Sequence, residues 1–174
     1  MNPKLKHDPR EPFISLIVLL PKFAEIPKTQ ISLVLNHLYD DQFERGLDGY
    51  FVESVIPGQQ YCIILGGRLL LVHNYAEPYF PRNLGQTNAA VAEQISDGEL
   101  ARRVEKHAAW VSVDHLSGEG SEDERWDIVG CIMAELAPSD GEALLLPGRN
   151  TIIDFTEDTR TKLRGQSVLK QLGF

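Results

Sequence analysis

The chain has 174 residues, of which 43% are hydrophobic and 24% charged, and it carries a formal net charge of −8 at pH 7. This length suits one domain with its own core, and this composition excludes a largely disordered chain. The negative charge would repel a phosphate backbone, and no basic cluster extends beyond Lys4, Lys6 and Arg10. We therefore predict one globular domain that does not bind nucleic acid.

The most apolar stretch, FISLIVLLP at residues 13–21, is too short to cross a membrane. A spanning helix needs about 20 apolar residues, and Pro21 ends this run. The flank KLKHDPREP mixes acidic and basic residues, and no small-residue cleavage pattern follows, which argues against a signal peptide. Two cysteines, Cys62 and Cys131, cannot form the disulfide framework of a small secreted domain. These features predict a cytoplasmic protein without membrane contact.

The first part of the chain indicates an arm, a strand and a helix. Residues 1–12 are polar, contain three prolines and lack periodicity, so we expect a flexible N-terminal arm. Residues 13–20 form a continuous apolar run, typical of a strand buried on both faces. A helix is predicted within residues 27–41, where apolar residues recur at helical spacing: Ile31, Val34, Leu35 and Leu38.

Three strand candidates follow, at residues 50–56, 60–65 and 69–75. The last two flank Gly66-Gly67, a dipeptide that accepts the positive φ values of a tight hairpin turn. Two prolines interrupt residues 76–83, so we expect this segment to leave the sheet as a loop.

Helix signals then come before the next strand. Residues 87–107 are predicted to be helical in two pieces, with Ser96 and Glu99 as the capping box of the second piece. Residues 109–116 are predicted to form a strand.

The end of the chain repeats this alternation. Ser121 and Glu124 form a second capping box, which predicts the start of an amphipathic helix. Two short strands, residues 142–146 and 151–155, flank the turn PGRN, and a final helical region starts near Thr156.

This order of elements predicts an α+β fold with a single mixed or mostly antiparallel sheet and helices packed on it. We expect residues 13–174 to form that one domain. Residues 13–73 and 109–155 share a β-α-β-β plan with little residue identity, which leaves an internal structural duplication open.

Structural motifs are spread over most of the chain: ISLIVLLP, LLLVHNYAEPYFPRN, VEKHAAWVSVDHL, RWDIVGCIMAELA and ALLLP. Together these segments resemble an uncharacterised bacterial family that is known as a domain of unknown function. No activity or ligand is assigned to that family. The resemblance therefore implies a bacterial, cytoplasmic α+β domain and transfers no site residues.

Asp114 and His115 are the candidate catalytic residues, because they end a strand before a glycine loop and an acidic helix start. Adjacent strand residues point to opposite faces, however, so the two cannot easily act as a pair. We expect His115 on the aliphatic face that meets the helices and Asp114 on the other face, beside Trp110 and Ser112. The structural alternative is a strand end with His115 at the edge of the core.

The sequence offers two candidate metal sites, one of aspartates and one of histidines. Asp114 could join Asp123 and Asp127, which are i,i+4 on the next helix, as oxygen ligands of a divalent cation. In the alternative, the two helix residues are simply solvated. His73, His107 and His115 could bind zinc if their strands were neighbours, but their spacing carries no zinc signature, and structural roles are the alternative.

The proline-flanked segment offers a candidate binding surface. Its aromatic, arginine and amide side chains are of the kind that anchor partners: Tyr79, Phe80, Arg82 and Asn83. The alternative is a lid over the open end of the core.

The leading functional interpretation is a non-enzymatic binding or protein-interaction module without a cofactor. It would use a sheet edge or residues 76–86 to meet a protein partner or a second copy of itself. The competing interpretation is a metal-assisted hydrolase with an Asp/His cluster near residues 107–127.

Overall fold

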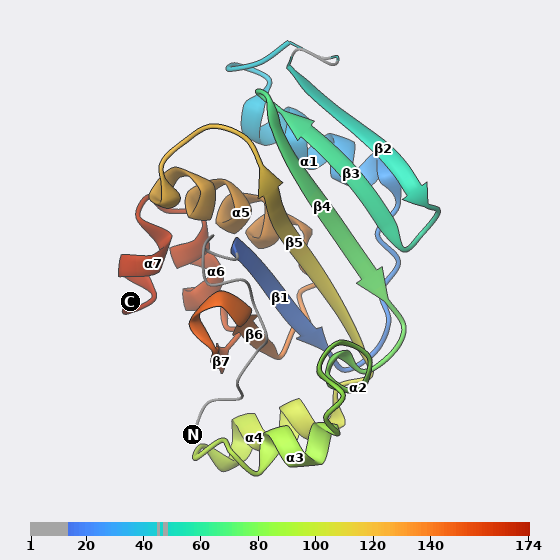
Figure 1. Cartoon of the computed structure of the whole chain (residues 1–174), viewed down its shortest axis with the longest axis vertical. Helices are drawn as coiled ribbons and strands as arrows, with labels where there is room; N and C mark the ends of the chain where they lie inside the picture. Colours follow the sequence, from blue (N-terminus) through green and yellow to red (C-terminus); the bar gives the residue numbers. More distant parts are fainter. Residues whose placement is uncertain (1–13, 45, 47–48) are drawn as a thin grey trace.

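The computed structural model describes residues 14–44, 46 and 49–174, which contain one antiparallel sheet of seven strands (Figure 1). The strands are β1 (Ile14–Leu20), β2 (Tyr50–Ile56), β3 (Gln60–Leu65), β4 (Arg68–Tyr75), β5 (Ala109–Ser117), β6 (Ala143–Leu146) and β7 (Thr151–Asp154). Their order across the sheet is β2-β3-β4-β5-β1-β6-β7, and every neighbouring pair is antiparallel. The predicted α+β class is confirmed. The predicted arm at residues 1–12 lies outside the described residues.

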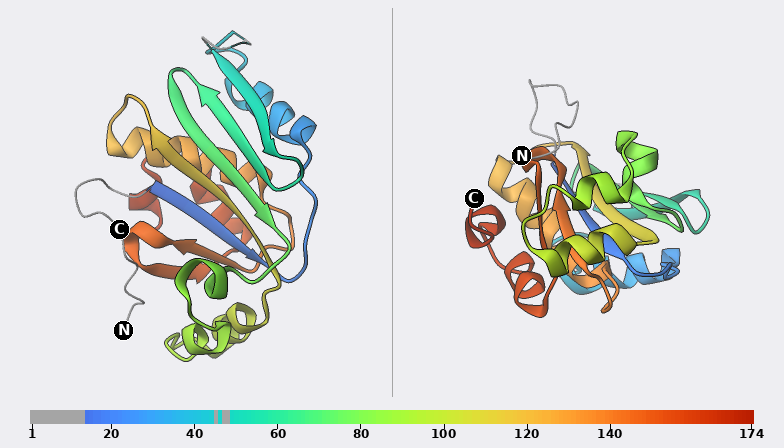
Figure 2. Two further views of the ribbon diagram at one scale, coloured as in Figure 1. Left: turned by 45° about the vertical axis from the view of Figure 1, so that its right-hand side comes forward. Right: turned by 90° about the horizontal axis from the view of Figure 1, so that it is seen from below.

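Helices cover the two faces of the sheet unequally (Figures 1 and 2). The first face carries α1 (Lys28–Tyr39), α5 (Glu122–Leu136), α6 (Glu157–Leu163) and α7 (Val168–Gln171). At one end of the second face lie α2 (Tyr79–Leu84), α3 (Asn88–Ala92) and α4 (Gly98–Lys106), and a short 3₁₀ turn, η1 (Pro147–Arg149), joins β6 to β7. None of the helices in the described ranges is long and apolar enough to cross a membrane.

A hydrophobic core lies on each side of the central strands. On β5, Val111 and Val113 belong to the first core with Trp126 of α5, whereas Trp110 belongs to the second core with Phe80 of α2. The predicted alternation of β5 side chains is therefore confirmed. Strand β1 is buried on both faces and contributes to both cores, which explains why all its residues except Ser15 are apolar.

Two local predictions, a hairpin turn and a helix capping box, are confirmed. Gly66 and Gly67 have φ values of 53° and 76° and join β3 to β4, as the hairpin prediction requires. Helix α5 begins with the predicted capping box: Ser121 Oγ accepts from the Glu124 N–H at 3.2 Å, and Glu124 Oε2 accepts from the Ser121 N–H at 2.7 Å.

Two local predictions were wrong. Residues 79–84 form the helix α2 rather than a loop, because Pro78 is its N-cap and Pro81 lies in its first turn, where backbone N–H groups have no partner within the helix. The N-cap of α4 is Asp97 rather than Ser96: Asp97 Oδ1 accepts from the backbone N–H of Glu99 at 2.9 Å.

A buried arginine of α6 donates hydrogen bonds to the carbonyl oxygens at the C-terminal end of α5. Arg160 donates to the carbonyl oxygens of Ala134, Ala137 and Pro138 at 2.6, 2.9 and 2.9 Å. Its guanidinium also lies 4.8 Å from the ring centroid of Phe155. Because the last carbonyls of a helix have no partner within it, Arg160 replaces the water that would otherwise solvate them.

Candidate functional site

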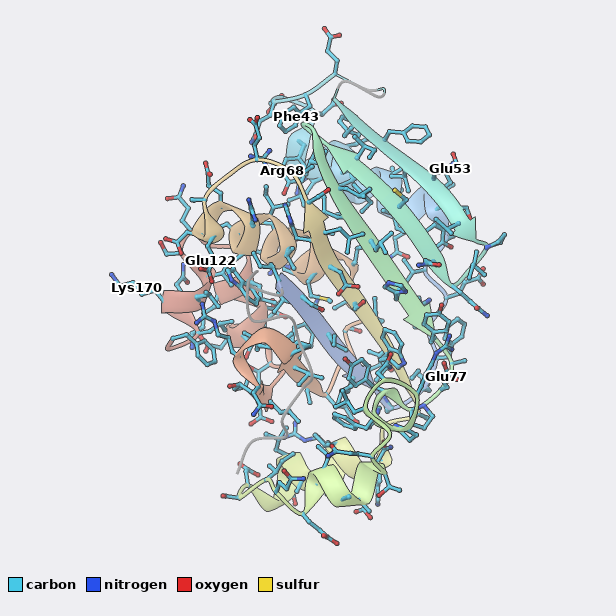
Figure 3. All side chains as sticks on the ribbon, viewed as in Figure 1. Phe43, Glu53, Arg68, Glu77, Glu122 and Lys170 are labelled. Atoms are coloured by element: carbon cyan, nitrogen blue, oxygen red, sulfur yellow. The ribbon has the colours of Figure 1, made fainter. Side chains whose placement is uncertain are left out.

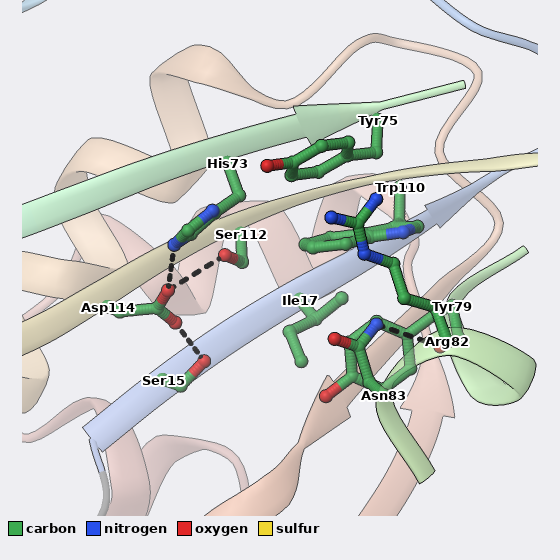
Figure 4. Close-up of a pocket in the computed structure, with 10 residues that line it drawn as sticks. All are labelled: Ser15, Ile17, His73, Tyr75, Tyr79, Arg82, Asn83, Trp110, Ser112 and Asp114. Carbon is green, nitrogen blue, oxygen red and sulfur yellow. Dashed lines mark hydrogen bonds and ion pairs between the residues drawn. The ribbon is translucent and has the colours of Figure 1, made fainter. Parts of the chain in front are cut away.

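A pocket of about 210 Å³ opens on the second face of the sheet, where strands β1, β4 and β5 meet helix α2 (Figure 4). Strand residues form its floor and α2 forms one wall. The lining residues are Ser15, Ile17, His73, Tyr75, Tyr79, Arg82, Asn83, Trp110, Ser112 and Asp114. The pocket therefore combines a polar end with an aromatic end.

Asp114 is the centre of the polar end. Its carboxylate accepts a hydrogen bond from Ser15 Oγ and another from Ser112 Oγ at 3.0 Å, and its Oδ2 lies 3.3 Å from His73 Nε2 (Figure 4). Strand register creates this cluster: Ser15 faces Asp114 across β1 and β5, and His73 faces Ser112 across β4 and β5. The four side chains thus come from three adjacent strands.

Aromatic rings form the other end. The ring centroid of Trp110 lies 5.1 Å from that of Tyr75 and 5.1 Å from that of Tyr79, which meets it edge-on. Arg82 lies over the Tyr75 ring at 4.4 Å and forms an ion pair with Glu77, which follows β4 beside α2 (Figure 3). The guanidinium at the rim is therefore already matched by a carboxylate.

Burial controls the charges at the polar end. It raises the pKa of Asp114, although the hydrogen bond from Ser15 and the nearby His73 act in the opposite direction. Burial also lowers the pKa of His73, against the attraction of Asp114. In mildly alkaline solution the imidazole is accordingly neutral, and the carboxylate has neutral hydrogen-bond donors around it.

A buried histidine fixes the position of α2 over the pocket. His107 Nε2 accepts from the backbone N–H of Tyr79 at 2.9 Å, so the hydrogen of the neutral ring must be on Nδ1, which contacts the Val104 carbonyl. Phe80 packs edge-on against the same imidazole at 5.3 Å. Asn83 Nδ2 donates to the Tyr79 carbonyl at 2.8 Å within α2. These contacts hold the aromatic wall in place.

Three of the four residues predicted to bind a partner line the pocket: Tyr79, Arg82 and Asn83. Tyr79 is only 7% exposed, and Phe80 is fully buried in the second core, so neither presents a free ring to a protein. The lid alternative describes this segment better, because α2 closes the second core and walls the pocket.

The two catalytic candidates separate as the strand pleat predicts. Asp114 lines the pocket, whereas His115 lies on the first face, is 7% exposed, and has a buried Nε2 without a partner in the described part of the chain. Both serines of the pocket donate to Asp114 and not to His73. The site therefore lacks the hydroxyl-imidazole contact with which a histidine activates a serine nucleophile.

The predicted aspartate grouping does not assemble. Asp127 accepts from the backbone N–H groups of Ser167 at 3.1 Å and Val168 at 2.9 Å, at the start of α7. Asp123 is exposed in the first turn of α5, a helix that packs on the face opposite Asp114. No group of three or more potential metal ligands occurs in residues 14–44, 46 and 49–174.

The three histidines are also dispersed. His73 lines the pocket, His107 binds the backbone of α2, and His115 is on the other face of the sheet. The predicted alternative of structural roles fits His107, whose two ring nitrogens both contact backbone atoms.

Sequence reasoning missed Ser15, Ser112, Tyr75 and Trp110 as members of a site and did not pair His73 with Asp114. Ser15 is the one hydroxyl residue inside the apolar run of β1, and this exception was the available signal. The pairings depend on which strands are neighbours, and the sequence does not encode that in any short motif.

Burial of three histidines makes stability depend on pH. Burial lowers the pKa of His73, His107 and His115, so the unfolded chain binds protons near pH 6.5 that the folded chain does not. Each of these histidines is expected to lower the free energy of unfolding below about pH 6.5, with a slope of at most about 1.4 kcal/mol per pH unit. Burial raises the pKa of Asp114, and this carboxyl acts in the opposite direction, so the effect of one histidine is the difference between the natural chain and its variant. Urea denaturation at a series of pH values from 8 to 5.5 measures the free energy of unfolding.

A variant of His107 assigns that pH effect. His107→Gln should reduce the slope, because the variant has no imidazole at this position to gain a proton on unfolding. A difference in the free energy of unfolding between the natural chain and His107→Gln that stays constant from pH 7 to 5.5 would contradict the prediction.

Comparison with family models, with curated proteins and with solved structures gives no match for this chain. The fold and the pocket thus define the protein only as a class: an antiparallel α+β protein with a polar and aromatic pocket on one face of its sheet. The resemblance to an uncharacterised bacterial family stays a prediction.

Proposed function

We propose that the protein is a cytoplasmic, non-enzymatic binding protein whose pocket takes a small molecule. The observation that carries the proposal is the pairing of a desolvated carboxylate, Asp114, with an aromatic wall in one concave site. Ligand sites typically combine apolar and aromatic walls with a few convergent polar groups. The pocket volume of about 210 Å³ suits a molecule of fragment size.

The class of binding module predicted from the sequence is retained, with a small molecule in place of a protein at residues 76–86. Association through a sheet edge stays a prediction.

Tryptophan fluorescence tests the proposal, because Trp110 lines the pocket and Trp126 is buried in the other core. A set of soluble fragments covering cations, anions and neutral aromatics is expected to include members that quench the emission saturably. Dissociation constants of about 0.1–1 mM are ordinary for ligands of this size.

Two variants test whether the fragments that quench the fluorescence bind in the pocket. Asn83→Phe fills the mouth of the pocket from an exposed helix position and should abolish it. Glu93→Phe, at an exposed position that does not line the pocket, should leave it intact. The proposal fails if no fragment quenches saturably, or if Asn83→Phe quenches as the natural chain does.

A further inference from the structure

The buried carboxylate of Asp114 is surrounded by donors that carry no charge at pH 8. Its side chain is 13% exposed, and its partners are the hydroxyls of Ser15 and Ser112 and the imidazole of His73. Burial disfavours the ionised form of this carboxyl and raises its pKa, and a cation placed against it would stabilise the ionised form. The most favourable addition to this end of the pocket is therefore a positive group.

We propose that the pocket binds a small organic cation, with its ammonium or amidinium group on Asp114 and its body against the rings of Tyr75 and Trp110. This inference rests on the proposed function and names the ligand class of the same site.

The aromatic wall favours the same charge. The faces of tyrosine and tryptophan rings are electronegative and attract cations within about 6 Å of the ring centroid. The Tyr75 ring already holds one cation in this way, because the Arg82 guanidinium lies 4.4 Å from its centroid. Trp110 packs 5.1 Å from Tyr75, and His73 lies between these two rings and Asp114 (Figure 4).

Arg82 does not reverse this preference. Arg82 lines the pocket and its charge helps to lower the pKa of His73, but that charge is matched by the ion pair with Glu77, and both side chains are partly exposed. Asp114 has no such partner, since its neighbours are two hydroxyls and an imidazole of lowered pKa. The net charge of −8 on the chain also attracts cations over longer distances.

Three ligands of one shape and different charge test the inference: benzamidinium, benzamide and benzoate. Calorimetric titration at pH 8, where His73 is neutral, is expected to give benzamidinium a dissociation constant at least tenfold below that of benzamide, because hydrogen bonds to a charged group are the stronger ones. Benzoate is expected to give no measurable heat of binding.

Variants of two aspartates assign the preference to the pocket. Asp114→Asn keeps the shape and removes the charge, so benzamidinium and benzamide should bind within about threefold of each other. Asp123→Asn removes an exposed carboxylate on the other face and should preserve the tenfold difference. The ligand series on the natural chain decides the inference even if Asp114→Asn does not fold.

The outcomes separate this inference from the proposed function. Benzamide or benzoate binding as tightly as benzamidinium would overturn the cation class and leave a small-molecule pocket in place. A tenfold preference that survives in folded Asp114→Asn would overturn the role of Asp114. If none of the three ligands binds, the inference fails, and the fragment screen with Asn83→Phe then decides whether the pocket binds small molecules at all.

Discussion

Replacing Phe80 with alanine is expected to lower the free energy of unfolding by about 3–5 kcal/mol, the usual cost of removing a fully buried aromatic side chain. The Phe80 ring is 0% exposed and packs edge-on against Tyr79 at 5.4 Å and His107 at 5.3 Å. Its loss would leave a cavity beneath α2 in the second core. Urea denaturation followed by circular dichroism measures the change.

The control for this variant lies two residues further along α2. Arg82→Ala removes an exposed side chain that pairs with Glu77, and exposed ion pairs contribute at most about 1 kcal/mol. The folded fraction of Phe80→Ala should have the same mass by light scattering as the natural chain. A change in mass with a stability loss under 1 kcal/mol would instead identify Phe80 as the exposed anchor that the sequence suggested.

The variant Arg160→Met is expected to cost about 2–4 kcal/mol of stability, because the buried carbonyls of Ala134 and Ala137 and the partly buried carbonyl of Pro138 lose their donor. Methionine retains much of the packing against Phe155 and removes only the hydrogen bonds and the charge. Burial lowers the pKa of Arg160, so the variant also relieves a desolvation cost, and the loss is smaller than three full hydrogen bonds.

Arg164→Met provides the comparison for Arg160→Met. Arg164 is more exposed and pairs with the carboxylates of Glu135 and Glu157, so its replacement should change stability by about 1 kcal/mol or less. Equal losses in the two variants, measured by urea denaturation, would show that the capping of α5 by Arg160 contributes nothing beyond a surface ion pair.

Local patterns predicted much of this fold. The continuous apolar run of β1, the glycine turn between β3 and β4 and the capping box of Ser121 with Glu124 each depend on neighbouring residues only, and each is confirmed. The pleat of β5 also placed Asp114 and His115 on opposite faces correctly. Residues that are close in the sequence, within one turn or one strand, determine such features.

The pocket depended on contacts that no local pattern contains. Local spacing groups Asp114 with residues that follow it in the chain, Asp123 and Asp127, whereas its partners are Ser15 and His73 on adjacent strands. Strand order brings these residues together, and it is fixed by packing of the whole sheet. The error at Pro78 and Pro81 is different: prolines break strands and also begin helices, and the sequence alone supported either outcome.

The central position of β1 has a consequence for how the chain acquires its structure during synthesis. Its neighbours are β5 and β6, so β1 leaves the ribosome long before either partner exists, while β2, β3 and β4 can already form their two hairpins. A strand in which six of seven residues are apolar, and which waits for distant partners, is a hazard for intermolecular association. Slowing translation between residues 75 and 109 should therefore increase aggregation of the nascent chain and leave the hairpins unaffected.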